Sequence, residues 1–264
     1  MNMCRITDPI IKKMEKTVRE CGDILLHADR DEHFVSSKEG HGNFVTVYDK
    51  KIQEKLRKSL NEILPEAAFV GEEEDIHPDI HEGFAFVVDP IDGTANFVRD
   101  LKGSVISVGL LKDGKPYIGV VYNPYLDEMF TAKKGCGAYV NDKPIAVSKR
   151  PLSDGMVLFG TAPYYRELND KAFELAGNFW KQALDLRRTG TAALDLCLVA
   201  AGRAELFFEL ILQPWDYAAG AVILTEAGGK IETLEGTALT FDKPCSVLAT
   251  NGCKVEGVPV NKDW

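Results

Sequence analysis

The order of apolar and polar positions divides the chain into three parts with different periods. Near the start, Thr7-Asp8-Pro9 is typical of a helix start, and apolar residues recur at helical spacing from Ile10 to about Ala28. A second helix is predicted from about Asp49 to Leu64, where Pro65 ends it. The polar, glycine-containing stretch between them predicts a loop.

The middle of the chain has the pattern of short strands joined by tight turns. Runs of β-favouring residues predict five strands, and Asp113-Gly114 joins the third and fourth as a hairpin turn. We expect these strands to form an antiparallel meander. The predicted strands are 68–70, 84–88, 105–111, 117–121 and 128–132.

After about residue 150 the pattern changes to alternating strands and helices. Sheets of both strand types covered by helices predict a mixed α/β fold, a layered α-β-α-β-α sandwich. Because no flexible linker separates the halves, we expect one domain over 1–264 with two lobes, about 1–150 and about 151–264. The predicted helices are 167–180, 192–201 and 215–227, and the predicted strands are 156–160, 183–186, 205–208, 230–233 and 246–249.

The composition is that of an ordinary globular protein and restricts the partners. Of the 264 residues, 45% are apolar and 27% are charged, and the formal net charge is −9. That charge argues against nucleic acid or an anionic membrane as a partner, and no apolar run reaches the roughly 18 residues of a membrane span. Six cysteines without a C-x-x-C pair or zinc-like spacing, and a start without a signal-peptide pattern, favour reduced thiols and a cytoplasmic location. A negative protein that handles a negative substrate would need cations.

Two aspartates at the end of a predicted strand carry the strongest chemical signal. In Asp89-Pro90-Ile91-Asp92-Gly93-Thr94 the proline should end strand pairing, so the chain should reverse sharply between the two carboxylates. Carboxylates and the Ile91 carbonyl are oxygen ligands of the kind that Mg²⁺ prefers, and the N–H groups of Gly93 and Thr94 suit a phosphate oxygen. The same residues are also typical of a simple tight turn.

Two more carboxylates lie in comparable positions. Glu72 follows a short predicted strand, and Asp216 lies in the first turn of the helix that begins near Trp215. Each alone could be an ordinary surface acid, or an acid that a helix dipole stabilises by roughly 0.3–1 kcal/mol. Four such carboxylates in these sequence contexts favour a metal-binding site.

These segments resemble the inositol monophosphatase family, part of a wider superfamily of lithium-sensitive, Mg²⁺-dependent phosphatases. The D-P-x-D-G-T and W-D-x-A-A-G motifs, at 89–94 and 215–220, form a highly specific pair. The resemblance spans most of the chain and implies the layered sandwich of that family, which is commonly a homodimer. The other matching segments, in the family's order, are Gly71-Glu72-Glu73, Gly190-Thr191-Ala192-Ala193 and Thr225-Glu226-Ala227-Gly228-Gly229.

The resemblance also implies roles for individual residues. Asp49 and Thr94 match the pair that orients the attacking water, and Glu72 is implied to take part in catalysis as well as in metal binding. Glu209 falls where relatives hold a sugar or inositol hydroxyl, Ala192 belongs to the same pocket, and Lys38 matches a lysine near the site. The implied ligands of two or three Mg²⁺ ions, which Mn²⁺ could replace, are Glu72, Asp89, the Ile91 carbonyl, Asp92 and Asp216.

Two positions depart from the family pattern. Relatives usually have an aspartate where this chain has Asn43, and a small residue where it has Tyr48. These departures affect local charge and loop shape and leave the implied ligand set complete.

The expected function is a Mg²⁺-dependent phosphomonoesterase acting on a small polyol or sugar phosphate, with inositol monophosphate as the leading substrate. A metal-activated water would attack without a phosphoenzyme, and Asp49 would take its proton through Thr94. One alternative keeps this core but uses fructose-1,6-bisphosphate, a 3′-phosphoadenosine nucleotide or NADP(H). The candidate selectors among these substrates are 163–166, Arg187-Arg188 and Glu209. The other alternative is a non-catalytic relative that acts as an interaction or regulatory protein.

Overall fold

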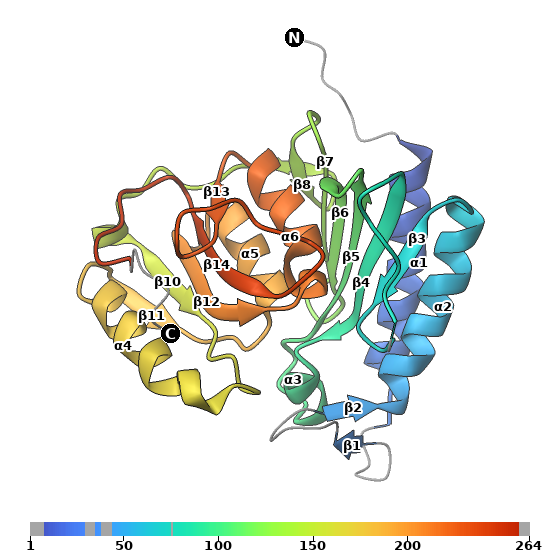
Figure 1. Ribbon diagram of the computed structural model, residues 1–264, viewed down its shortest axis with the longest axis horizontal. Coiled ribbons are helices and arrows are strands. Elements are labelled where there is room, and N and C mark those ends of the chain that lie inside the picture. Colours follow the sequence, from blue (N-terminus) through green and yellow to red (C-terminus); the bar gives the residue numbers. More distant parts are fainter. Residues whose placement is uncertain (1–7, 30–34, 38–43, 75, 259–264) are drawn as a thin grey trace.

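The computed structural model describes residues 8–29, 35–37, 44–74 and 76–258. Within these ranges six α-helices and two larger mixed sheets stack in five layers, which confirms the predicted α/β sandwich (Figure 1). A pair of helices covers one face of a seven-stranded sheet, a second pair fills the space between the sheets, and one helix covers the far face of a five-stranded sheet (Figure 1). None of the described helices is both long enough and apolar enough to cross a membrane.

The outer helix pair is formed by α1 (Pro9–Leu26) and α2 (Val47–Ile63). Asp8 begins α1, because its Oδ1 accepts a hydrogen bond from the Ile10 N–H at 2.8 Å. Thr46 and Asp49 form a reciprocal capping box that begins α2. Both helices bury an apolar stripe against the seven-stranded sheet, and each fully buried leucine there contributes about 1.5–3 kcal/mol.

The seven strands of the larger sheet follow one another in chain order. The predicted hairpin turn is confirmed, with positive φ angles of 51° at Asp113 and 69° at Gly114. The predicted meander is wrong at its first pair, which is parallel, because the long segment 72–83 carries the chain back before the next strand begins. The strands are β3 (Ala68–Gly71), β4 (Phe84–Asp92), β5 (Val105–Lys112), β6 (Lys115–Asn123), β7 (Glu128–Lys133), β8 (Ala138–Val140) and β9 (Lys143–Ile145).

Strand β4 continues past Pro90, contrary to the prediction that this proline ends the pairing. Asp89 pairs with Ser107 and Asp92 pairs with Val105, so three steps along β4 match two along β5. The proline lies in this bulge, where no ladder hydrogen bond is required of it. Residues three apart on a regular strand point to opposite faces, and the extra residue allows Asp89 and Asp92 to share one side.

The smaller sheet has the order β11-β10-β12-β14-β13 and contains both strand directions. Its outer face packs on α4 (Asn169–Trp180) through a cluster that includes Phe179 and Phe208. Strand β12 is longer than the predicted 205–208, so Glu209 lies inside the strand rather than at its end. The strands are β10 (Met156–Phe159), β11 (Asp185–Arg187), β12 (Leu206–Leu212), β13 (Lys230–Glu232) and β14 (Cys245–Thr250).

Helices α5 (Ala192–Ala200) and α6 (Pro214–Glu226) lie between the two sheets. Helix α6 contacts the larger sheet with almost no side chain between them. A Cβ added to Gly109 would lie 3.0 Å from the Ala218 Cβ, and one added to Gly119 would overlap the Ala219 carbonyl oxygen. This close approach brings the first turn of α6 to the depth of the β4 carboxylates.

Several short elements were not predicted. They are the antiparallel pair β1 (Val35–Ser37) and β2 (Phe44–Thr46), and the 3₁₀ turns η2 (Leu152–Asp154) and η3 (Arg166–Leu168). The short helix α3 (Thr94–Val98) begins directly after Gly93. Lys38 and Asn43, singled out from the sequence, lie outside the described residues.

Candidate active site

Most predicted site residues are brought together where β4 ends and several helices begin. Hydrogen bonds link the end of β4 to the starts of α3 and α5, and the start of α3 to that of α2. The Ser107 hydroxyl of β5 donates to the Trp215 carbonyl in the first turn of α6 at 3.4 Å. Segments far apart in the chain therefore meet at one point.

Three of the predicted metal ligands are held by backbone N–H groups. Asp89 Oδ1 accepts from the Ile91 N–H at 3.0 Å, Asp92 Oδ2 from the Ala193 N–H at 2.6 Å, and Asp216 Oδ2 from the Gln213 N–H at 2.8 Å. Asp89 and Asp92 are buried, and Asp216 is half-buried.

The fourth predicted carboxylate, Glu72, is placed by its own backbone. It is half-buried directly after β3, and its N–H donates to the Val88 carbonyl at 3.1 Å. This bond fixes Glu72 beside the end of β4.

The carboxylates repel one another strongly. Burial raises the pKa of Asp89 well above its ordinary value, and the negative charges of Glu72, Asp92 and Asp216 raise it further. Burial also raises the pKa of Asp216, and the charges of Asp92 and Glu72 raise it further. Burial raises the pKa of Asp92 to about 7. Within the described residues no Lys or Arg forms an ion pair with Asp89, Asp92 or Asp216. In the described part of the chain, their ionised forms therefore have no cationic side chain paired with them.

The chemistry of this donor set fits a hard divalent cation. All candidate ligands are oxygens, namely the four carboxylates and the Ile91 carbonyl, as Mg²⁺ prefers. In the described part of the chain, no three acidic, His or Cys side chains already stand at the spacing of ligands around an ion. Asp89, Asp92 and Asp216 are each turned toward a backbone N–H donor.

Asp49 and Thr94 lie next to this carboxylate set. Asp49 is 1% exposed, and its Oδ2 accepts from the Thr46 N–H at 2.7 Å and from the Thr46 hydroxyl at 2.5 Å. Its other oxygen, Oδ1, faces the Thr94 hydroxyl at 3.4 Å, and that hydroxyl lies 3.0 Å from the Ile91 carbonyl oxygen. Burial raises the pKa of Asp49 to about 7. Asp49 is therefore both a helix-capping residue and a carboxylate within reach of Thr94.

The turn at Gly93 is fixed by neighbours that the sequence did not indicate. Gly93 has a φ of 83°, and a Cβ there would overlap the Thr191 hydroxyl oxygen. Asn96 Nδ2 donates to Thr191 Oγ1 and to the Thr189 carbonyl, both at 2.9 Å. Asn96 thereby ties α3 to the loop before α5.

Glu209 is buried inside β12 and faces the same region. It is 6% exposed, and its Oε1 accepts from the Ala162 N–H at 2.8 Å. Burial raises its pKa to about 7, and its charge contributes to the raised pKa of Asp92. Glu209 is therefore a buried residue of the strand and not an exposed acid at its end.

The other residues predicted to contact the substrate have different surroundings. Ala192 is the first residue of α5 and is buried next to the N–H that binds Asp92. Partial burial, followed by the charges of Glu72, Asp216, Asp89 and Asp92, raises the pKa of Tyr164, whose side chain is still 49% exposed. Arg188 donates to Thr161 Oγ1 at 3.1 Å and attracts Glu209, whereas Arg187 pairs with Asp185 at 2.6 Å.

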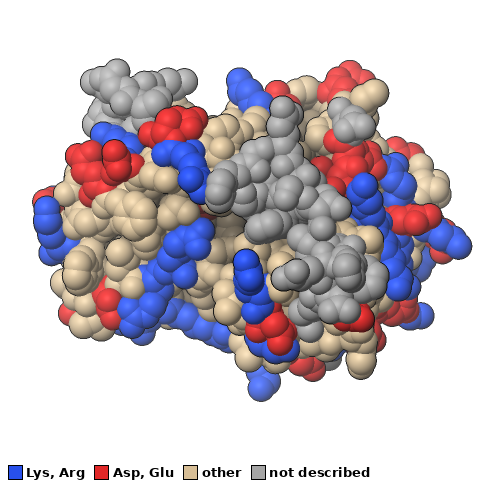
Figure 2. Space-filling view, turned by 90° about the horizontal axis from the view of Figure 1, so that it is seen from below, with Lys and Arg blue, Asp and Glu red and all other residues tan. Residues whose placement is uncertain are grey.

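The surface at this end of the molecule is not uniformly negative. In the view onto the end that carries α3, β1 and β2, Lys and Arg side chains lie on both sides of the grey segments (Figure 2). An anionic substrate that approaches from this side meets cationic groups, although the net charge of the chain is −9.

Comparisons with known proteins agree on one family. The model of the inositol monophosphatase family matches residues 7–260. The chain is 34% identical over 240 residues to an inositol-1-monophosphatase of Bacillus subtilis, covering 90% of each chain. It is 32% identical over 230 residues to the Nus factor SuhB of Salmonella typhimurium, covering 86% of each. The crystal structure of the extragenic suppressor protein suhB from Bartonella henselae superimposes with a TM-score of 0.84 at 34% identity, covering 92% of this chain and 94% of that one.

Proposed function

Because this chain belongs to the inositol monophosphatase family and is a phosphatase of phosphoric monoesters, we propose that it hydrolyses a small polyol or sugar phosphate with Mg²⁺. An inositol monophosphate is the leading substrate. The observation that carries this proposal is the meeting of four carboxylates with the Asp49–Thr94 pair at the end of β4.

Each part of the site has a role in the proposed mechanism. Glu72, Asp89, the Ile91 carbonyl, Asp92 and Asp216 would hold Mg²⁺, which would supply charge neutralisation and a water of lowered pKa. Asp49 accepts the proton of the attacking water through the Thr94 hydroxyl, and its raised pKa suits a base that works near neutral pH.

The phosphate would bind at the start of α3. The N–H groups of Gly93 and Thr94 point toward the phosphate oxygens in this proposal, as backbone donors at a helix start commonly do. Hydrolysis by water in one displacement requires no covalent phosphoenzyme.

The preference for a polyol rests on Glu209. A carboxylate accepts hydrogen bonds from neighbouring hydroxyl groups, and Glu209 lies within electrostatic range of Asp92. The same charge would repel a second phosphate, which disfavours fructose-1,6-bisphosphate. Tyr164, in the candidate selector segment 163–166, offers an exposed aromatic ring, so a 3′-phosphoadenosine nucleotide or NADP(H) remains the second substrate class to test.

A second candidate function is that of an interaction protein. The relatives named Nus factor SuhB, whose name denotes a factor rather than an enzyme, favour this candidate. The complete carboxylate set favours catalysis, and the two functions can coexist in one chain.

The test is turnover of a panel of phosphorylated polyols, sugars and nucleotides, compared by kcat/KM. We expect activity with Mg²⁺ or Mn²⁺, loss of activity in EDTA, and inhibition by Ca²⁺ and Li⁺. Full activity in EDTA would contradict the mechanism, and no turnover of any phosphoester would leave the interaction role as the better candidate.

A further inference from the structure

Helix α2 carries three polar residues one turn apart that all face the same side. Asp49, Gln53 and Arg57 follow at intervals of four, so they form one stripe along the helix. Asp49 reaches Thr94 in the proposed active site. Gln53 and Arg57 instead contact the turn 71–74, which carries the proposed ligand Glu72.

Gln53 binds this turn from inside the protein. It is 7% exposed, and its Oε1 accepts a hydrogen bond from the Glu73 N–H at 3.0 Å. A Cβ on Gly71 would lie only 2.5 Å from that same oxygen, so the absence of a side chain at this position lets α2 approach the turn. The Glu74 N–H closes the turn on the Gly71 carbonyl at 3.3 Å.

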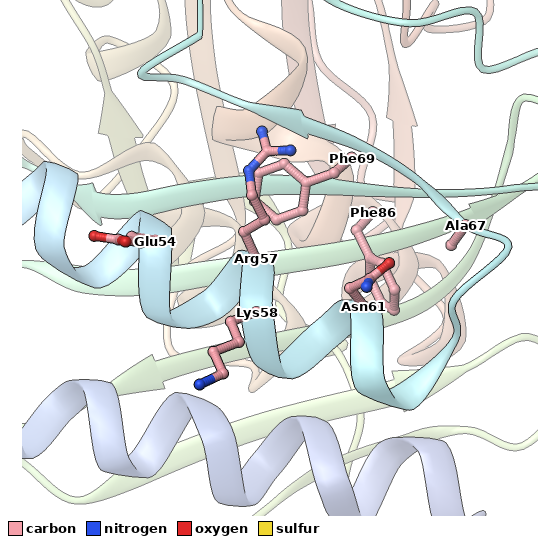
Figure 3. Close-up of a pocket in the computed structure, with 7 residues that line it drawn as sticks. All are labelled: Glu54, Arg57, Lys58, Asn61, Ala67, Phe69 and Phe86. Atoms are coloured by element: carbon pink, nitrogen blue, oxygen red, sulfur yellow. The ribbon is translucent and has the colours of Figure 1, made fainter.

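Arg57 holds the same turn from the outside. Its guanidinium forms an ion pair with Glu74 and lies 4.3 Å from the centre of the Phe69 ring in β3. Figure 3 shows Arg57 against Phe69, while the neighbouring Lys58 points away from that ring. The segments before and after Glu72 are therefore both attached to α2.

We infer that Gln53 and Arg57 are positioning residues, which set the place of Glu72 relative to Asp49 and so tune cation binding. This inference rests on the proposed function, because it takes Glu72 as a metal ligand. The backbone of Glu72 is bonded to Val88, and that of the next residue to Gln53, so the main chain from which the Glu72 carboxylate extends is fixed between β4 and α2. Partners outside the ligand shell commonly change metal affinity by about 10–100-fold.

The first experiment measures Mg²⁺ and Mn²⁺ binding by calorimetry, independently of turnover. Gln53→Met keeps the length of the side chain and removes the acceptor, and we expect the dissociation constant to rise about tenfold. Gln182→Met is the control, because Gln182 Oε1 also accepts from a backbone N–H, that of Glu256 at 3.0 Å, and its Nε2 donates to the Asn178 and Glu256 carbonyls. The control should lower thermal stability and leave cation binding unchanged.

A double mutant separates positioning from a general loss of structure. With Glu72→Gln already present, Gln53→Met should no longer weaken cation binding, because the residue that it positions has lost its charge. If Gln53→Met does not fold, Arg57→Met provides the test, with an expected rise of about threefold. Lys58→Met, one residue along α2, is its control.

The outcomes distinguish this inference from the proposed function. If the unmodified protein binds neither cation, the proposed function fails and the inference fails with it. If the unmodified protein binds the cation and Gln53→Met binds it equally well, only the inference is overturned. An equal effect of Gln182→Met would also overturn it, since the change would then reflect stability alone.

Discussion

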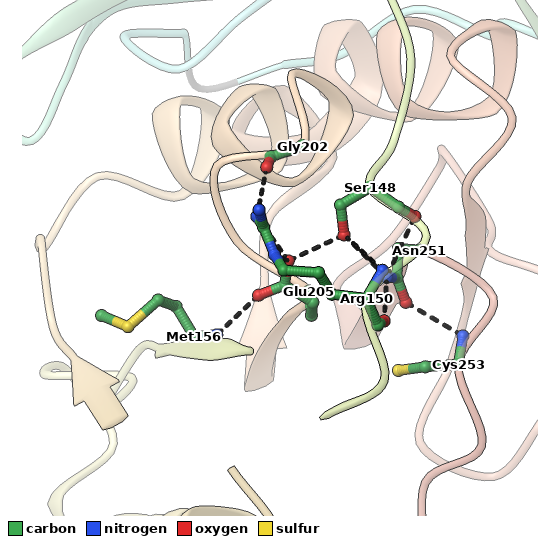
Figure 4. A network of polar contacts seen from close by, with 7 residues as sticks. All are labelled: Ser148, Arg150, Met156, Gly202, Glu205, Asn251 and Cys253. Carbon is green, nitrogen blue, oxygen red and sulfur yellow. Dashed lines mark hydrogen bonds and ion pairs between the residues drawn. The ribbon is translucent and has the colours of Figure 1, made fainter. Parts of the chain in front are cut away.

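Two glutamates four residues apart, Glu205 and Glu209, are both buried in the smaller sheet but have opposite surroundings. Glu205, next to the start of β12, is fully buried, and its Oε1 accepts from the Ser148 hydroxyl at 2.7 Å and from Arg150 Nε at 2.8 Å. Its Oε2 accepts from the Met156 N–H at 2.6 Å (Figure 4). Glu205 is thus neutralised and hydrogen-bonded within the fold.

Glu209 has no comparable cation. Among the described residues, no Lys or Arg forms an ion pair with it, and Arg188 attracts it only from farther away. Burial therefore raises its pKa to about 7. A buried carboxylate therefore indicates a functional role when no group of the fold balances its charge, and a structural role when the fold itself provides the cation and the hydrogen-bond donors.

The largest effect is expected from Asp92→Asn, which changes the charge of the proposed metal site and keeps its size. We expect kcat/KM to fall by more than about a hundredfold, since transition-state stabilisation by the cation is lost. The melting temperature of the metal-free protein should hold or rise, because a buried repelling charge is gone. Near-normal turnover would show that the D-P-x-D-G segment is only a turn.

Glu205→Gln should do the reverse and affect stability alone. A neutral amide must turn its NH₂ group toward at least one of the donors that Glu205 now accepts from, and Arg150 loses its partner. We expect the free energy of unfolding to fall by about 2 kcal/mol, measured by urea denaturation. A loss of kcat/KM at unchanged stability would overturn the contrast between the two glutamates.

Glu209→Gln should separate substrates from one another. If Glu209 holds a polyol, kcat/KM should fall about tenfold for an inositol phosphate and stay nearly unchanged for an aryl phosphate without hydroxyls. Equal losses on both substrates would place Glu209 in the catalytic machinery. No loss on either would remove the main support for a polyol substrate.

The smallest effect concerns pH. Burial raises the pKa of Asp49 and of Asp92 to about 7, so the metal-free fold favours their neutral forms. That contribution to stability is fully present below the unfolded pKa of about 4 and is lost as pH rises through about 7. Because cations bind the ionised carboxylates, the rise in melting temperature on adding Mg²⁺ should grow by a few degrees between pH 5.5 and 8. A rise that is constant or largest in acid would contradict these protonation states.

Local patterns predicted the helices and the hairpin well, because their signals are caps, periods and turns within a few residues. The parallel pairing of β3 with β4 could not be predicted in this way, since it depends on where the segment 72–83 runs in space. The same holds for the bulge at Pro90, because proline is compatible both with the end of a strand and with a bulge.

The sequence predicted which carboxylates belong to the candidate site, but not which groups hold them in place. Motifs named Asp89, Asp92 and Asp216, but the N–H groups that hold them come from distant or unremarkable positions such as Ala193. Gln53 and Asn96 were missed for a similar reason. An amide side chain carries no chemical signal until the backbone group that it binds is known.

The close contact of α6 with the larger sheet has a consequence for redesign of the site. Asp216 reaches the β4 carboxylates only because Ala218 and Ala219 lie directly on Gly109 and Gly119, with no side chain as a spacer. A single added methyl group at Gly119 would lift the whole helix and Asp216 with it, although Gly119 has no polar side chain. Attempts to evolve a new metal preference by varying the ligands alone would therefore not change how closely Asp216 approaches the β4 carboxylates, because Gly109 and Gly119 set that distance.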